Sequence, residues 1–136
     1  RQMMELFCVK LAIRNVDYHP ATLKEIETVV KAFEAAQEAG YSEAAELENK
    51  FHTLYISLCG NAQIMKLYES NWSIGTAFYM YRFTERPLSQ LESSFQQHKS
   101  ILNALKNKDE ALLRTTVEQH MSIVYETLEW YSQRIK

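Results

Sequence analysis

Three of the four histidines in this sequence occupy positions that helical spacing assigns to a protein core. His98 and His120 lie on apolar stripes, and His52 lies beside another such stripe. Glu48 precedes His52 by four residues, so these two side chains share one face of a helix. Burying such polar groups without partners costs on the order of a few kcal/mol each. We therefore expect the four side chains to converge, either on one another or on a cation.

The donor set that these four residues offer is typical of a divalent metal site. Imidazole nitrogens with one carboxylate oxygen suit Zn, Ni, Mn or Fe(II), and these donor types do not discriminate among the four ions. Three imidazoles and one carboxylate leave an octahedral ion with open positions for water or a ligand. The alternative is that each histidine is a hydrogen-bonded core residue and that the Glu48–His52 pair is a surface contact. His19, which precedes Pro20, is expected to be exposed.

Helices are the elements that must position these residues. Three glycines and two prolines in 136 residues are too few for the frequent turns of an all-β domain. We expect an all-α fold of six helices, whose short connections favour an antiparallel bundle. Five are expected near 1–15, 21–39, 42–59, 61–84 and 87–106, and the sixth runs from a turn at 107–109 to near residue 136. Gly40 and Gly60 are the expected helix stops, and Ser42 and Asn61 the expected N-caps.

The fourth expected helix is rich in aromatic residues. These residues fit a core, but Tyr79 and Arg82 also have the chemistry to project into a cavity and hold an anion. Arg1 also has two interpretations: it could bind an anion, or it could be a solvated residue at the end of a helix. Gly75, in the middle of this helix, indicates a kink or a close approach to a ligand.

Composition excludes several classes of protein. Apolar residues make up 46% and charged residues 24%, which is typical of one globular domain. A net charge of -2 argues against direct nucleic-acid binding, and no apolar stretch is long enough to span a membrane. The first ten residues do not resemble a signal peptide. Cys8 and Cys59 lie in apolar surroundings, so we expect reduced core cysteines in a cytoplasmic protein.

Five short segments, taken in order, resemble one known family. They are Arg-x-x-Met-Glu at 1–5, Glu-x-x-Phe-His at 48–52, Leu-Cys-Gly-Asn at 58–61, His-x-x-Ile-Leu-x-Ala-Leu at 98–105, and His120. The order and spacing are similar to those of the FCD domain, the C-terminal ligand-sensing domain of FadR-type regulators in the GntR family of bacterial transcription regulators. The resemblance covers residues 1–136.

The resemblance implies a bundle of six or seven antiparallel helices around a central metal and ligand pocket. It implies metal binding by an Asp and three His, whose positions match Glu48, His52, His98 and His120 here. It implies a small organic acid as effector, held partly by an Arg on the first helix, which matches Arg1. Operator DNA is bound in such proteins by an N-terminal winged helix-turn-helix domain, as a dimer; we expect that domain to be absent from residues 1–136.

Two positions depart from the family pattern. The usual Asp ligand is Glu48 here, which is one methylene longer and leaves the metal's identity open. The Glu that usually precedes the third ligand is Gln97, which removes a charge near the site.

The main hypothesis is a metal-dependent, effector-sensing domain of a homodimeric transcription regulator, not an enzyme. One alternative is a small helical metalloenzyme, although the sequence contains no His-Glu-x-x-His segment and no nucleophile elbow. The other is a metal-free helical interaction module. The sequence does not identify the effector, or say whether the regulator represses or activates.

Overall fold

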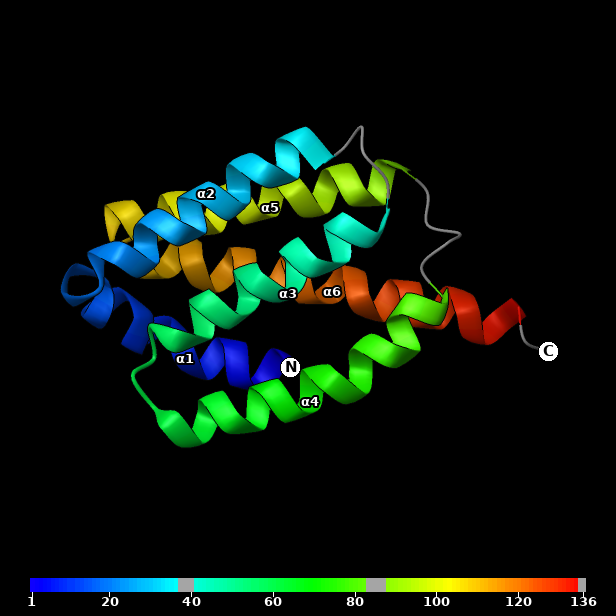
Figure 1. Cartoon of the computed structure of the whole chain (residues 1–136), viewed down its shortest axis with the longest axis horizontal. Coiled ribbons are helices and arrows are strands. Elements are labelled where there is room, and N and C mark those ends of the chain that lie inside the picture. The colour runs from blue at the N-terminus through cyan, green and yellow to red at the C-terminus, as the bar shows by residue number, and fades with distance from the viewer. Residues whose placement is uncertain (37–40, 83–87, 135–136) are drawn as a thin grey trace.

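Six α-helices and one 3-10 turn make up the described chain (Figure 1). The computed structural model describes the backbone of residues 1–36, 41–82 and 88–134, and the side chains of residues 1–36, 46–72 and 92–122. The elements are α1 (Gln2–Asn15), η1 (Val16–Tyr18), α2 (Pro20–Ala36), α3 (Tyr41–Ser57), α4 (Ala62–Arg82), α5 (Leu88–Asn107) and α6 (Glu110–Arg134). The expected all-α class is confirmed, and the described segments contain no strand.

Helix boundaries agree with the expected breakers at most positions. Asn61 caps α4, because its side-chain oxygen accepts hydrogen bonds from the backbone N–H groups of Gln63 and Ile64 at 3.0 and 3.2 Å. Pro20 is the first residue of α2, a position where its missing N–H costs nothing. Helix α3 begins at Tyr41, so Ser42 lies inside its first turn and is not the cap. Gly40 and Pro87 lie outside the described residues.

A tight turn joins α5 to α6. Lys108 has a φ of 54°, and its N–H bonds the carbonyl of Leu105 while the N–H of Asp109 bonds that of Ala104. These two bonds are those of a Schellman motif, which ends α5 and pairs two of the carbonyls in its last turn. The Asp109 side chain then accepts a hydrogen bond from the N–H of Leu112 at 2.9 Å and caps α6. The turn holds the two helices antiparallel.

The helices pack so that α3 and α6 run through the middle of the molecule. In Figure 1, α2 and α5 lie along one side and α1 and α4 along the other. Direct contacts join α5 to α6, α2 to α3 and to α5, α1 to α6, and α3 to α4. Among the largest fully buried side chains are Tyr55, Tyr68, Phe33, Phe51, Ile26, Leu105 and Leu113. The core therefore surrounds the middle helices, which carry three of the four residues that the sequence singles out.

Three further expectations can be compared with the structure. Cys8 and Cys59 are both buried and free of disulfide bonds. Helix α4 continues without interruption through Gly75. None of the described helices combines the length and apolarity that crossing a membrane requires.

Candidate metal centre

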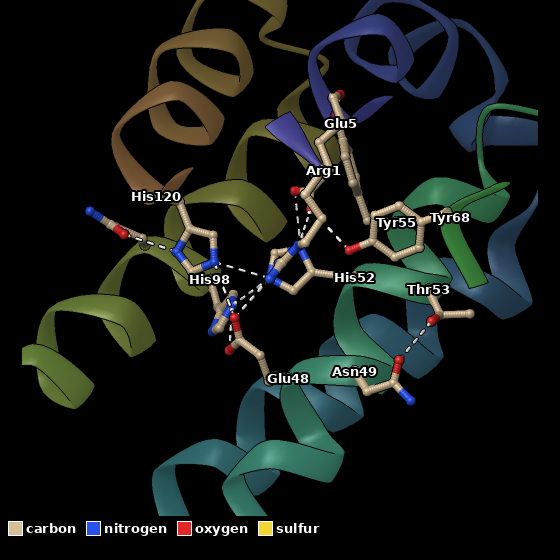
Figure 2. Close-up of polar contacts among 11 residues, drawn as sticks. Arg1, Glu5, Glu48, Asn49, His52, Thr53, Tyr55, Tyr68, His98 and His120 are labelled. Atoms are coloured by element: carbon tan, nitrogen blue, oxygen red, sulfur yellow. Dashed lines mark hydrogen bonds and ion pairs between the residues drawn. The ribbon is translucent and has the colours of Figure 1, made fainter. Parts of the chain in front are cut away.

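Four side chains from three helices point toward one another in the core (Figure 2). Glu48 and His52 lie one turn apart on α3, and His98 and His120 come from α5 and α6. The three histidines are at most 2% exposed, whereas the Glu48 side chain is 22% exposed. These four residues are called the ligand cluster below. Their position in the middle of the bundle follows from the apolar stripes, which turn these faces of all three helices inward.

The three imidazoles meet through one nitrogen each. Nε2 of His52 lies 3.0 Å from Nε2 of His120 and 3.4 Å from Nε2 of His98. Glu48 adds both carboxylate oxygens. Its Oε1 lies 3.0 Å from Nε2 of His52 and 3.3 Å from that of His120, and its Oε2 lies 3.3 Å from Nε2 of His98. One ligating atom from each of the four residues lies within 4.8 Å of the others.

The second ring nitrogen of two histidines is held by a neighbour. Nδ1 of His52 lies 3.1 Å from Oε2 of Glu5, and Nδ1 of His120 lies 2.9 Å from Oε1 of Gln97. Both neighbours offer an oxygen acceptor, which favours the tautomer that carries the proton on Nδ1 and, in the neutral ring, keeps a lone pair on Nε2. Gln97 therefore orients His120 although it lacks the charge of the family's usual Glu. Nδ1 of His98 is buried with no hydrogen-bond partner among the described residues.

Charges in the cluster shift the pKa values in opposite directions. Burial raises the pKa of the Glu48 carboxyl, but His98 and His52 outweigh this and hold it well below its ordinary value. Burial lowers the pKa of His98 well below the ordinary value and also lowers that of His120. Burial alone lowers the pKa of His52, but the Glu5 and Glu48 carboxylates raise it overall. Near neutral pH, the cluster therefore offers one carboxylate and neutral imidazoles at His98 and His120.

This arrangement fits a divalent metal ion. Bonds of about 2.1 Å from imidazole nitrogens to a metal place neighbouring ligand atoms about 3.0 Å apart in an octahedral site and about 3.4 Å apart in a tetrahedral one. Nε2 of His52 lies 3.0 and 3.4 Å from the other two Nε2 atoms, which matches this range. Histidines that were only core hydrogen-bonders would point at separate partners. Here the three rings each direct one nitrogen, Nε2, at one point beside the Glu48 carboxylate, which is the arrangement that a cation stabilises.

Glu5, on α1, is a residue of this site that the sequence analysis did not select. Its carboxylate is 0% exposed and bonds Nδ1 of His52. A signal for it exists in the sequence, because Glu5 is in helical phase with the buried Cys8 and Ala12. A carboxylate on a buried stripe of α1 is the same kind of anomaly as a histidine on the stripes of α5 and α6.

Arg1 lies beside Glu5 and Trp72. Its Nε donates to Oε1 of Glu5 at 3.1 Å, and its guanidinium carbon lies 4.4 Å from the centre of the Trp72 ring. Its Nη2 and the indole Nε1 of Trp72 are both buried and have no acceptor among the described side chains. Arg1 is therefore a fixed, partly buried cation and not a solvated helix end. The side chains of Tyr79 and Arg82, the other two residues that we expect to bind an effector, lie outside the described residues.

Comparison with protein families identifies the domain. Residues 1–122 match the family model of the FCD domain. The chain belongs to the FCD domain family. FCD domains are the effector-sensing regulatory domains of GntR-type transcription regulators, so the chain is a regulatory domain and not an enzyme.

The fold of this chain is similar to that of a solved structure. That structure, E. coli McbR/YncC, has a TM-score of 0.77 and 22% sequence identity. The match covers 94% of this chain and 62% of that one. At this identity the likeness shows the fold alone. A search of curated proteins finds no match.

Proposed function

We propose that this FCD domain senses a small organic acid at a divalent metal ion held by the ligand cluster. The observation that carries the proposal is the convergence of Glu48, His52, His98 and His120 on one point in the bundle. When bound there, the metal would supply a Lewis-acidic centre for an oxygen of the effector. Among Zn, Ni, Mn and Fe(II), the donor set favours none decisively.

Arg1 and Trp72 supply the second part of the proposed effector site. The guanidinium Nη2 and the indole Nε1 are donors without acceptors, and buried donors are usually paired. A carboxylate accepts well from both, and the charge of Arg1 strengthens the bond. Tyr79 and Arg82 lie further along α4, the helix that carries Trp72, and they stay in the proposal as effector-binding residues.

The proposed output is a change in operator affinity. The effector and the metal would bind one arrangement of the bundle more tightly and so shift the population toward it. An N-terminal winged helix-turn-helix domain, outside residues 1–136, would then bind operator DNA with a different affinity. The regulator would act as a homodimer in the cytoplasm.

A thermal-shift measurement tests the metal part. Chelator-treated protein is expected to melt at a higher temperature with Zn, Ni or Mn, because an ion that binds only the folded state stabilises it. The double variant His98→Ala and His120→Ala should lose this response, whereas His19→Ala, which changes an exposed histidine, should keep it. A melting temperature of the wild type that no metal changes would refute the metal site.

The same measurement extends to the effector. With metal present, a panel of hydroxy acids, sugar acids and dicarboxylic acids should contain compounds that raise the melting temperature further. Trp72→Phe should weaken that second shift, because it removes the indole N–H but keeps an aromatic ring, and it should leave the metal response intact. Equal responses of Trp72→Phe and wild type to every active acid would remove Trp72 from the site.

A further inference from the structure

One buried carboxylate, Glu5, contacts the ligand cluster and Arg1 at the same time. Its Oε2 lies 3.1 Å from Nδ1 of His52. Its Oε1 accepts hydrogen bonds from Nε of Arg1 at 3.1 Å and from the Tyr68 hydroxyl at 2.9 Å. Figure 2 shows these contacts on the side of the His52 ring away from Glu48. The Glu5 backbone is held as well, since its carbonyl oxygen accepts from the Tyr55 hydroxyl at 2.9 Å.

The two groups that face Oε1 of Glu5 are both hydrogen-bond donors. The Arg1 guanidinium has donors and no acceptor, and the Tyr68 hydroxyl donates its proton to Oε1. The remaining oxygen therefore presents an acceptor to Nδ1 of His52. An acceptor there keeps the proton on Nδ1 and leaves Nε2, the atom that faces the ligand cluster, free to bind a cation.

We propose that Glu5 is a positioning residue, which fixes His52 in the tautomer that can bind a metal and anchors Arg1 with its other oxygen. This inference rests on the proposed function, because it assigns a role toward the same metal. It adds α1 to the three helices that supply ligands. It also makes one side chain responsible for both the metal ligand and the arginine that we expect to bind the effector.

Glu5→Gln is the informative variant, because glutamine keeps the shape but has one acceptor and one NH2 group. With its oxygen toward Arg1 and Tyr68, its NH2 faces Nδ1 of His52 and favours the tautomer whose Nε2 carries the proton. With its oxygen toward His52, its NH2 meets Nε of Arg1, and two donors face each other. Neither orientation satisfies all the contacts that the carboxylate satisfies.

The test is the affinity for Zn²⁺, measured by competition with a chromogenic chelator. We expect Glu5→Gln to bind zinc about 10- to 100-fold more weakly than wild type, the range typical when the partner of a metal-bound histidine is lost. Glu25→Gln, which removes an exposed carboxylate from α2, is the matched control and should bind like wild type. Circular dichroism establishes that both variants are folded.

A second readout uses wild-type protein and does not depend on a variant that folds. In zinc-saturated, 15N-labelled protein, the Nδ1 proton of His52 should give a downfield resonance that exchanges slowly with solvent. A proton found on Nε2 of His52, or an Nδ1 proton that exchanges freely, would overturn the inference. So would a folded Glu5→Gln variant with the zinc affinity of wild type. Failure of wild-type protein to bind zinc is a different result, and it would refute the proposed function itself.

Discussion

His98 is fully buried against two aromatic rings. It is 0% exposed, its ring stacks on Phe33 at 4.6 Å with an interplanar angle of 13°, and Phe51 lies 4.2 Å away. An imidazolium in these apolar surroundings would be costly, which explains why the pKa of His98 lies well below the ordinary value. The aromatic neighbours therefore keep this histidine neutral, which is the form that binds a metal.

The lowered pKa values of His98 and His120 predict that metal-free protein loses stability in mild acid. Below about pH 6.5 the unfolded chain takes up protons at both histidines while the folded protein does not. The free energy of unfolding therefore decreases as the pH is lowered. The raised pKa of His52 opposes this with a contribution that is present in acid and lost as pH rises through its folded value. Because the pKa of His98 lies well below its ordinary value and that of His120 is lowered as well, we expect a net loss of stability in acid.

Urea denaturation of chelated protein at about pH 7.5 and about pH 5.5 measures this loss. His98→Gln should reduce the difference between the two pH values, because glutamine does not titrate. His19→Gln, at an exposed position, should leave it unchanged. Wild-type stability that is equal or higher at the lower pH would contradict the prediction.

At the scale of elements, the end of α3 is fixed by α1. The Asn15 side chain donates to the carbonyls of Leu58 and Cys59 at 3.0 and 3.4 Å, which pairs groups that the end of a helix leaves open. Gly60 follows with a φ of 67°, the left-handed conformation that turns the chain toward α4. This junction sets the position of α3 along its axis, and α3 carries Glu48 and His52.

Substitutions at Gly60 should separate backbone strain from side-chain contact. Gly60→Val should destabilise the domain by about 1–2 kcal/mol or more, because a β-branched residue strongly disfavours positive φ. Gly60→Asn should cost less, because Asn tolerates this conformation better than other side chains. An added Cβ would lie 3.4 Å from the Asn15 amide, an ordinary contact, so crowding is not the cause. Equal losses for the two variants in urea denaturation would argue against strain.

At the scale of the whole molecule, the sequence was most informative where a single side chain broke a local pattern. His98 and His120 could be singled out because each interrupts an apolar stripe, and Asn61 because it follows a glycine stop. The pairing of Glu5 with His52 could not be predicted in the same way, because it joins residues 47 positions apart. It depends on how α1 packs in the bundle, which spacing within one helix does not encode. The side chain of Arg1 was ambiguous for the same reason.

Large apolar side chains remain exposed on two neighbouring helices. Met3 and Phe7 on α1 are 81% and 54% exposed, and Leu67 on α4 is 59% exposed. Arg1, which precedes α1, and Glu5 on α1 contact Trp72 and Tyr68 on α4, so the start of α1 lies beside α4. Apolar groups of this size are enriched where a protein binds a second copy.

We therefore expect the surface that carries Met3, Phe7 and Leu67 to contribute to the proposed homodimer. Light scattering after gel filtration should give twice the chain mass of 15.9 kDa for wild type. Phe7→Glu should shift the mass toward the monomer, because it places a charge in an apolar contact. Lys10→Glu, which changes an exposed residue of the same helix that is already charged, should not. A monomeric wild type, or a Phe7→Glu variant that stays dimeric, would rule this face out.

The separation of the ligands along the chain has a consequence for biosynthesis. Glu48 and His52 leave the ribosome before His98, which follows two helices later on α5, and before His120, which follows three helices later on α6. Between the synthesis of His52 and that of His98 the nascent chain therefore has only two of the four ligands, and such a site binds divalent ions weakly. Metal would enter only after α6 has docked, so the ion that is held reflects the pool that meets the finished bundle.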